Sequence, residues 1–232
     1  MVTVTIHQPQ YIPWLGYFDK MDCADVFVYL DNVQYIKNEF KNRNRIKSAR
    51  GPIWLTVPVN YRFPEKIMDV TISQRERWQH KHWQSLISNY RKAPYFNKYR
   101  ETFIDIFERP WSHLSTLNIY LTEKLKDLLG ISTKTETASS MNISGESTDR
   151  LIAICKNFKC THYLAGADSE KYMDFVRFQK AGIKVMVQEF HHPRYNQLFG
   201  DFVPYLSVVD LLMNHGEDSL NILRGRKVVS AQ

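Results

Sequence analysis

The sequence predicts an α/β fold, with a Rossmann-like, mostly parallel sheet and a helical insert. Two observations lead to it. A strand, a helix and a second strand follow one another within about thirty residues of the N-terminus, which is the size of a βαβ unit. Strands and helices alternate again after residue 147, beyond three successive helical segments. We therefore expect one α/β domain over residues 1–232, with a helical cap or insert at about residues 75–130.

The first βαβ unit begins with a short apolar strand over residues 2–6. Pro9 ends this strand, because proline has no N–H to give to a sheet ladder. Pro13 suits the first turn of a helix over residues 13–23, where the missing N–H costs nothing. The second strand covers residues 25–30. Asp31 then follows a carboxyl strand end, the edge at which open parallel sheets bind ligands.

The middle of the chain carries two more expected strands and three helices. The strands cover residues 53–59 and 67–72. The third helix, over residues 113–129, stops at Gly130, and the second follows Pro94. Apolar residues four apart indicate one buried face of the first helix; they are Trp78, His82, Leu86 and Tyr90.

The last third of the chain returns to alternating elements. We expect a helix over 147–158, a strand over 162–164, a helix from Asp168 to Ala181, a strand over 183–187 and a helix opened by Ser207. The polar stretch over residues 133–145 is the best linker candidate, although we expect the later elements to rejoin the first sheet.

Positive charge is concentrated in two segments of a chain whose formal net charge is +7. Residues 37–50 hold six basic side chains against one acidic, and residues 75–100 hold seven against one. Such clusters indicate a phosphate, a pyrophosphate or a nucleic-acid backbone as partner, although a solvated surface is the alternative. Recognition helices and RNA-binding signatures are missing, so we do not expect a DNA partner.

Several classes of protein are disfavoured. The sequence contains no run of eighteen apolar residues, so we predict no membrane span. We also expect no export signal and a cytoplasmic location. The three cysteines are sparse, as in a reducing compartment. His191 and His192 are adjacent and cannot both face one ion from a regular element, so we predict no metal site. No Walker loop or Gly-x-Gly-x-x-Gly motif is present, and the cofactor stays unidentified.

The first candidate cluster is His7 and Gln8, with Tyr11 and Trp14 following. An imidazole at the end of a first strand titrates near neutral pH, and the helix that follows offers free N–H groups to an anion. The alternative is a turn histidine that bonds only to backbone.

The second cluster begins at Asp31 and Gln34, directly after a strand's carboxyl end. Alternating basic residues then put their side chains on one side of an extended segment. Guanidinium and ammonium groups together suit a pyrophosphate, whereas a charged guard along a sheet edge is the alternative. The residues concerned are Lys37, Lys41, Arg43, Asn44, Arg45 and Lys47.

Two later clusters add polar and aromatic residues. Tyr195 and Gln197 follow another expected strand end. Ser207 precedes Asp210 by three residues, which favours a helix cap over a nucleophile, and Asn214 lies one turn further on.

Together these motifs resemble the WbqC-like protein family along the full length of the chain. The matching motifs are His7-Gln8-Pro9, Pro13-Trp14, Gly16-Tyr17-Phe18, Asp31, Gln34-Tyr35, Lys37, Arg43-Asn44-Arg45-Ile46-Lys47, Trp54-Leu55-Thr56-Val57-Pro58-Val59, His82-Trp83, Tyr163-Leu164, Gly166, Pro193, Tyr195, Gln197, Leu206-Ser207, Asp210-Leu211-Leu212 and Asn214. Ala165 stands where the family more often has serine. The order of the elements also looks like a nucleotidyltransferase fold of the His-x-Gly-His class, although residues 14–17 lack both of its histidines.

The resemblance implies an enzyme of bacterial surface-polysaccharide (O-antigen) biosynthesis. It would transfer a glycyl or other acyl group to the amine of a nucleotide-linked amino sugar. The donor stays open between aminoacyl-tRNA, an acyl carrier protein, coenzyme A and a free amino acid with ATP. Nucleotidyl transfer and a non-catalytic sugar-nucleotide-binding subunit are the alternatives.

Within that reading, His7 would accept the proton of the attacking amine, with Asp31 as the other candidate base. The diphosphate would be held by Lys37, Arg43, Arg45 and Lys47, and three aromatic rings would stack on base or sugar. The rings are Tyr11, Trp14 and Tyr195, and the polar groups that orient the substrate are Gln34, Asn44 and Gln197.

Overall fold

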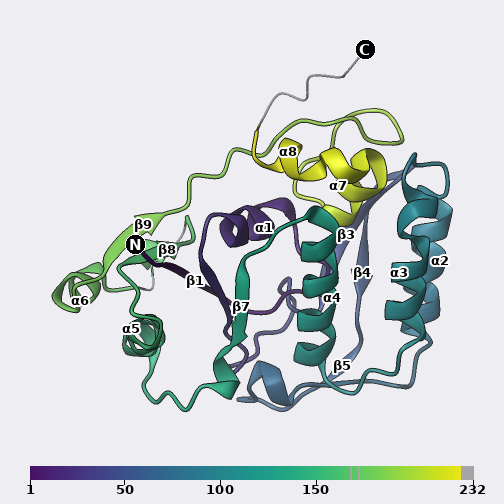
Figure 1. Cartoon of the computed structure of the whole chain (residues 1–232). Coiled ribbons are helices and arrows are strands. Elements are labelled where there is room, and N and C mark those ends of the chain that lie inside the picture. Colours follow the sequence, from purple (N-terminus) through teal and green to yellow (C-terminus); the bar gives the residue numbers. More distant parts are fainter. Residues whose placement is uncertain (168, 172, 226–232) are drawn as a thin grey trace. The chain divides into compact units, whose positions relative to one another are not determined.

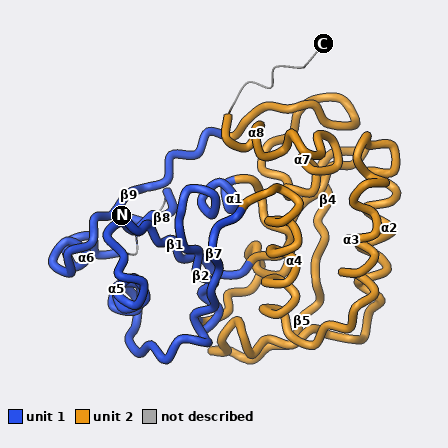
Figure 2. The backbone as a smooth tube through the Cα atoms, viewed as in Figure 1, with its two compact units in different colours: residues 1–9, 16–33, 132–191 blue, residues 10–15, 34–131, 192–232 orange. Residues whose placement is uncertain are grey.

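The computed structural model describes residues 1–167, 169–171 and 173–225 (Figure 1). The chain divides into two compact units (Figure 2). Unit 1 consists of residues 1–9, 16–33 and 132–191. Unit 2 consists of residues 10–15, 34–131 and the chain from residue 192 onward.

A five-stranded parallel sheet forms the centre of unit 1 and confirms the predicted Rossmann-like α/β fold. Its strands are β1 (Thr3–His7), β2 (Val26–Tyr29), β7 (Lys134–Thr137), β8 (His162–Ala165) and β9 (Lys184–Val187). Their order is β7-β2-β1-β8-β9. The chain builds outward from β1 on one side and then returns to add β8 and β9 on the other. The order therefore reverses between β1 and β8, as in doubly wound nucleotide-binding sheets.

Helices cover both faces of this sheet, as a parallel sheet requires. They are α1 (Leu15–Asp22), α5 (Ser147–Asn157) and α6 (Phe175–Lys180), with 3₁₀ turns over Ala138–Ser140 and Ser169–Lys171. Alternate residues of β1, Val4 and Ile6, belong to an apolar core shared with α5 and α6. His7 has the opposite parity and contacts the aromatic ring of Tyr17 in α1.

Two predictions for this unit were wrong. The expected linker over 133–145 contains β7, whose four residues are all polar and pair only with β2 at the edge of the sheet. Polar residues suit an edge strand, and their composition hides it in the sequence. Helix α6 begins at Phe175, because the Asp174 side chain accepts a hydrogen bond from the Arg177 N–H (3.2 Å). The expected cap at Asp168 falls outside the described residues.

Unit 2 combines short antiparallel strand pairs with helices. The strands β3 (Arg43–Ser48) and β4 (Gly51–Thr56) form a hairpin, and β5 (Val59–Asn60) pairs with β6 (Thr71–Ile72). The helices are α2 (Trp78–Tyr90), α3 (Phe96–Glu108), α4 (Leu114–Leu129), α7 (Val208–His215) and α8 (Ser219–Leu223), with 3₁₀ turns over Ile67–Asp69 and Gly216–Asp218.

The predicted helices of unit 2 are confirmed more closely than its strands. All four residues of the expected face of α2 are buried, and Gly130 ends α4 in the left-handed conformation (φ +79°). The strand expected over 53–59 instead breaks near Pro58 into β4 and β5, and the one expected over 67–72 begins as a 3₁₀ turn. In the described part of the chain, no helix is both long and apolar enough to cross a membrane.

A buried histidine lies in the core of unit 2. His82 is 5% exposed, and its Nδ1 lies 2.7 Å from the Tyr11 hydroxyl. Burial lowers the pKa of His82 to about 4, and a backbone hydrogen bond to Thr56 opposes that shift only in part. The folded state therefore holds the neutral imidazole at neutral pH.

Acid should destabilise the fold through this histidine. Because the pKa of His82 is lower in the folded state than the ordinary value of 6.5, its contribution is complete above about pH 6.5 and is lost as the pH falls toward 4. The free energy of unfolding should drop by up to about 3 kcal/mol over that window. Urea titrations of His82→Gln should show a flatter pH dependence, whereas the exposed control His80→Gln should follow the wild type. Equal slopes for wild type and His82→Gln would contradict this assignment.

Candidate functional site

The reversal of strand order in unit 1 marks a candidate ligand-binding edge. His7 ends β1 and Gly166 follows β8, the two strands between which the order reverses. Crevices at such points accept ligands in open parallel sheets. A Cβ built on Gly166 would meet no atom within 4 Å, so the backbone there borders open space. The sequence prediction of a site after the first strand is thus consistent with the topology.

Hydrogen bonding fixes the protonation pattern of His7. Its Nδ1 lies 3.1 Å from the carbonyl oxygen of Gln8. A carbonyl oxygen can only accept, so in the neutral ring Nδ1 carries the proton and Nε2 carries the lone pair. The Tyr17 ring stands edge-on at 4.7 Å, and its hydroxyl donates to the same Gln8 oxygen at 3.4 Å. In this tautomer, Nε2 is the ring nitrogen that can accept a proton.

Asp31 and Ser139 join the ends of two neighbouring strands. Asp31 is 3% exposed, and its carboxylate accepts hydrogen bonds from the Ser139 N–H (2.9 Å) and the Ser139 hydroxyl (2.6 Å). These contacts tie the segment after β2 to the turn after β7. Both carboxylate oxygens thus already have a donor within unit 1. Ser139 was missed because its stretch had been assigned to a linker.

Helix α1 is held against the sheet by polar contacts that the sequence analysis also missed. The Lys20 ammonium donates to the Ile6 carbonyl (3.1 Å), and burial lowers the pKa of Lys20 to about 7. Gln188, directly after β9, donates to the Gly16 carbonyl (2.9 Å) and to the Asp19 carboxylate (2.6 Å). The spacing could have predicted the position of Lys20, because residues three apart lie on the same face of a helix and Tyr17 is three residues earlier.

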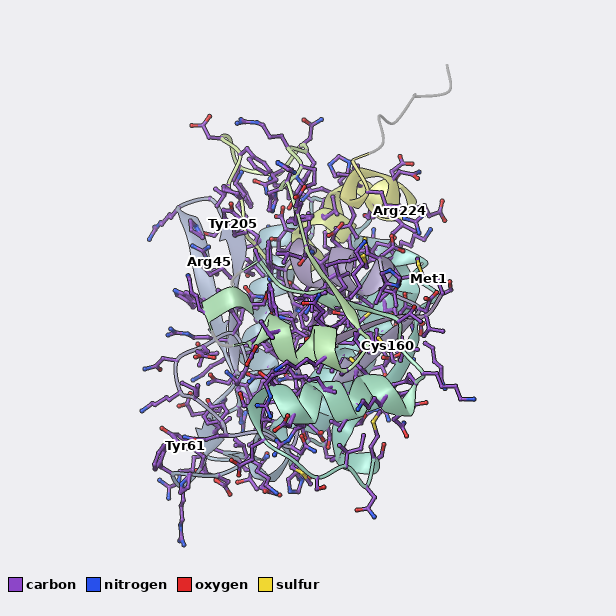
Figure 3. All side chains as sticks on the ribbon, turned by 90° about the vertical axis from the view of Figure 1, so that its left-hand side faces the viewer. Met1, Arg45, Tyr61, Cys160, Tyr205 and Arg224 are labelled. Carbon is purple, nitrogen blue, oxygen red and sulfur yellow. The ribbon has the colours of Figure 1, made fainter. Side chains whose placement is uncertain are left out.

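In unit 2, two of the predicted phosphate ligands lie on one face of β3. The guanidinium carbons of Arg43 and Arg45 stand 4.5 and 5.6 Å from the ring centre of Trp54, which is 46% exposed. Arg43 donates to the Asn38 carbonyl (2.6 Å), and Arg45 donates to the Tyr205 carbonyl (3.4 Å; Figure 3). The pair forms a cationic surface supported by an aromatic ring, with donors suited to an anion.

Lys47 occupies a different environment, although it shares that strand parity. It is 1% exposed, and its ammonium donates to Gln197 Oε1 (3.1 Å) and to the Asp201 carbonyl. Its N–H donates to the Tyr90 hydroxyl (3.0 Å), which donates to Asp210 (2.8 Å). Burial raises the pKa of the Asp210 carboxyl, and the donors around it oppose that shift. Lys47 is therefore part of a buried polar network.

The remaining predicted residues of unit 2 divide by burial. Trp14 and Ser207 pair as an isolated bridge, and the Ser207 hydroxyl accepts from the Val209 N–H (3.2 Å), which confirms the cap. Gln34 and Lys37 are exposed. Asn44 donates to the Ile12 carbonyl (2.8 Å), and Asn214 donates to the Asp210 carbonyl (2.7 Å). The rings of Tyr11 and Tyr195 are buried.

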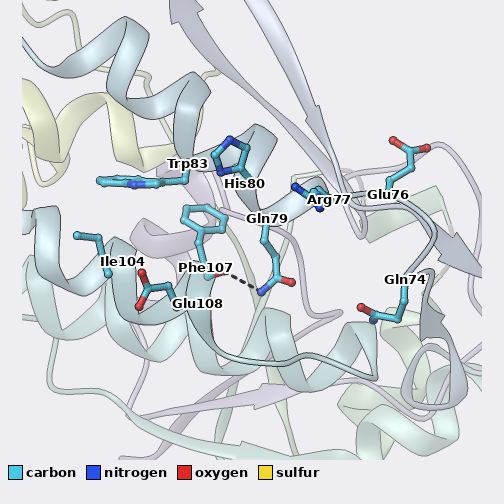
Figure 4. A pocket seen from close by; sticks show the side chains of 9 residues that line it. All are labelled: Gln74, Glu76, Arg77, Gln79, His80, Trp83, Ile104, Phe107 and Glu108. Atoms are coloured by element: carbon cyan, nitrogen blue, oxygen red, sulfur yellow. Dashed lines mark hydrogen bonds between the residues drawn. The ribbon is translucent and has the colours of Figure 1, made fainter.

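A separate hollow of about 430 Å³ lies between α2 and α3 in unit 2 (Figure 4). Trp83 and Phe107 form its apolar wall, and Gln79 donates to the Phe107 carbonyl (2.9 Å). Arg77, Glu76 and other polar side chains stand at its rim, a mixture typical of small-molecule sites. Among the described residues, no group of three or more His, Cys, Asp or Glu side chains is arranged to hold a metal ion.

The sequence as a whole was compared with known families and proteins. The model of the WbqC-like protein family matches residues 8–222. The chain belongs to the WbqC-like protein family. A protein of Mycobacterium tuberculosis, named "Uncharacterized protein Rv1507c", is 36% identical to it over 228 residues, covering 97% of this chain and 98% of the relative. No solved structure matches. The family match includes residues of both units.

The polar network of this WbqC-like chain should be sensitive to the loss of one hydroxyl. Tyr90→Phe leaves the Lys47 N–H and a buried Asp210 oxygen each without a partner. We expect a loss of about 1–3 kcal/mol in the free energy of unfolding, measured by urea titration. Tyr205→Phe, at a tyrosine that is 53% exposed, is the matched control and should change stability by only a few tenths. An unchanged midpoint for Tyr90→Phe would show that the network contributes no stability.

Proposed function

We propose that this protein transfers an acyl or aminoacyl group, such as glycyl, to the amine of a nucleotide-linked amino sugar. The product would enter a bacterial surface polysaccharide such as O-antigen, and the reaction would take place in the cytoplasm. One observation carries the proposal: His7 stands at the point of reversed strand order, with its Nδ1 hydrogen-bonded to a carbonyl oxygen. Membership of the WbqC-like family agrees with it.

His7 would act as the general base. The sugar amine attacks the donor carbonyl, so an N–C bond forms as the C–S or C–O bond of the donor breaks. Nε2 takes the proton from the attacking nitrogen and returns it to the leaving thiolate or alkoxide. Asp31 is the weaker candidate for this role, because Ser139 already donates to both of its oxygens.

Arg43 and Arg45 would bind the diphosphate of the sugar nucleotide. Both guanidinium groups lie on one face of β3 beside an exposed indole, and Lys37 is exposed in the same unit. The fork of a guanidinium matches phosphate oxygens in two hydrogen bonds. Lys47 would support this strand from within, since its ammonium is enclosed by Gln197 and by backbone carbonyls.

The donor would be an anionic carrier or a small thioester. Residues 75–100, which hold seven basic side chains, are the candidate contact for tRNA or an acyl carrier protein. The hollow of Figure 4 lies partly in this segment and offers an apolar wall beside Arg77.

The direct test mixes the purified protein with a nucleotide-linked amino sugar and, in separate reactions, aminoacyl-tRNA, acyl carrier thioester, acyl-coenzyme A, or glycine with ATP. Mass spectrometry should find an acyl group added to the sugar in one of them. Release of pyrophosphate from ATP or CTP and a divalent metal, without acylation, would favour nucleotidyl transfer instead. Binding without any product would favour a non-catalytic sugar-nucleotide-binding subunit.

Removing the imidazole should separate catalysis from binding. His7→Ala should lower kcat by about 10²–10⁴-fold, while the Kd for the sugar nucleotide stays within a few-fold. His191→Ala, at an exposed histidine of unit 1, is the control and should keep full turnover. If His7→Ala turns over at the wild-type rate, His7 takes no part in the reaction.

The arginines should affect binding more than the chemical step. Arg43→Ala and Arg45→Ala should each raise the Kd for the sugar nucleotide about tenfold, because each removes a charge-assisted hydrogen bond. Calorimetric titrations at two salt concentrations should also show a weaker salt dependence for both variants. Arg50→Ala, in the same basic segment, should bind like the wild type. Equal losses for all three variants would indicate a diffuse charge effect.

A further inference from the structure

Two cysteines meet at the C-terminal end of α5 in unit 1. The Cys160 N–H donates to the Cys155 carbonyl (3.0 Å), the Lys159 N–H donates to the Lys156 carbonyl (3.0 Å), and Lys159 has a left-handed φ of +51°. This pair of hydrogen bonds with a left-handed residue between is a Schellman helix ending. In that ending, the side chains at the positions of Cys155 and Cys160 lie on the same side of the helix end and frequently contact each other.

The backbone geometry brings the two thiols within disulfide reach. With a nitrogen–oxygen distance of 3.0 Å, standard bond lengths allow the two Cα atoms to be at most about 7 Å apart. Disulfides join Cα atoms about 4.4–6.8 Å apart. Both cysteines also belong to the same apolar core cluster, and each thiol is the main influence on the pKa of the other.

The two thiols differ in reactivity. The interaction with Cys155 is the main influence that lowers the pKa of Cys160, whereas burial and the bond that the Cys160 thiol donates to the His162 carbonyl (3.1 Å) oppose ionisation. The interaction with Cys160 and burial raise the pKa of Cys155. Cys160 is 7% exposed and Cys155 is fully buried. A reagent therefore meets Cys160 first, and Cys160 is also the thiol that ionises more readily.

We propose that Cys155 and Cys160 form a peroxide-responsive dithiol that closes to an intramolecular disulfide. The Cys160 thiolate attacks one peroxide oxygen, the O–O bond breaks, and the departing oxygen leaves as water or an alcohol after taking a proton. The Cys155 thiol then attacks the sulfenic sulfur of Cys160, the S–S bond forms, and water leaves. The two thiols lose two electrons to the peroxide, and a dithiol reductant restores them.

The disulfide would act on the central sheet. It links the last turn of α5 to a residue two positions before β8, and β8 pairs with both β1 and β9. Strand β8 leads to Gly166, at the proposed ligand edge. Oxidation would thus tether this strand covalently to its covering helix. The inference is independent of the proposed function, because it concerns only the thiols and their backbone.

The test uses the full-length chain carrying Cys23→Ser, which removes the exposed third thiol. After treatment with hydrogen peroxide, mass spectrometry should show the loss of two hydrogen atoms, a cross-link between Cys155 and Cys160, and full reversal by dithiothreitol. Circular dichroism before and after treatment checks that the chain stays folded. Stable addition of oxygen atoms without the cross-link would overturn the proposal.

Two further variants separate the roles of the thiols. With Cys155→Ser added, dimedone should label a sulfenic acid at Cys160, because the second thiol is missing. With Cys160→Ser added, the rate of oxidation at Cys155 should fall at least about tenfold below that of Cys160 in the other variant. Equal rates would reject Cys160 as the attacking thiol. The cross-link in the Cys23→Ser chain tests the proposal even if a double variant fails to fold.

Discussion

The parallel pairing of β1 on both of its edges is the constraint on which the rest of unit 1 depends. The register aligns His7 with Tyr29 of β2, and Tyr29 with Thr137 of β7, so three strands end at one level. Asp31 and Ser139 each lie two residues beyond an aligned strand end, which explains why they meet. The same pairing brings the start of β8 beside that of β1 and leaves Gly166 at the reversal. One ladder of backbone hydrogen bonds thus creates the edge at which we propose the chemistry.

A buried polar network connects several elements of unit 2. Ions that leave water need partners: the Lys47 ammonium donates to Gln197, and the Tyr90 hydroxyl accepts from the Lys47 N–H and donates to one oxygen of Asp210. These contacts join β3 to α2, to α7 and to the loop before it. Arg43 and Arg45 are only partly buried on the same strand. The alternation of residues along the strand does not reveal burial. Burial makes Lys47 a supporting residue and leaves Arg43 and Arg45 as candidate ligands.

The sequence was sufficient where local pattern decides the structure. Periodicity located α2 and α4, and the apolar runs located β1, β2 and β9. It failed where a distant partner decides. Strand β7 is polar and exists because β2 offers it a free edge, and the burial of Lys47 depends on a loop about 150 residues away. Ser139 could have been found only after β7 was placed. The sequence therefore allowed candidate residues to be named, but it did not allow their burial and contacts to be predicted.

The contacts of α1 show how His7, the base of our proposal, is held at a strand end. Tyr17 supports the ring, Lys20 bonds to the carbonyl just before it, and Gln188 fastens the start of the helix. Burial disfavours the charged form of Lys20, so its pKa falls to about 7 while an unfolded chain keeps the ordinary 10.5. Between these values the unfolded state binds more protons, and the contribution of Lys20 to stability improves as the pH rises. The helix that contacts the His7 ring is therefore attached most firmly under alkaline conditions.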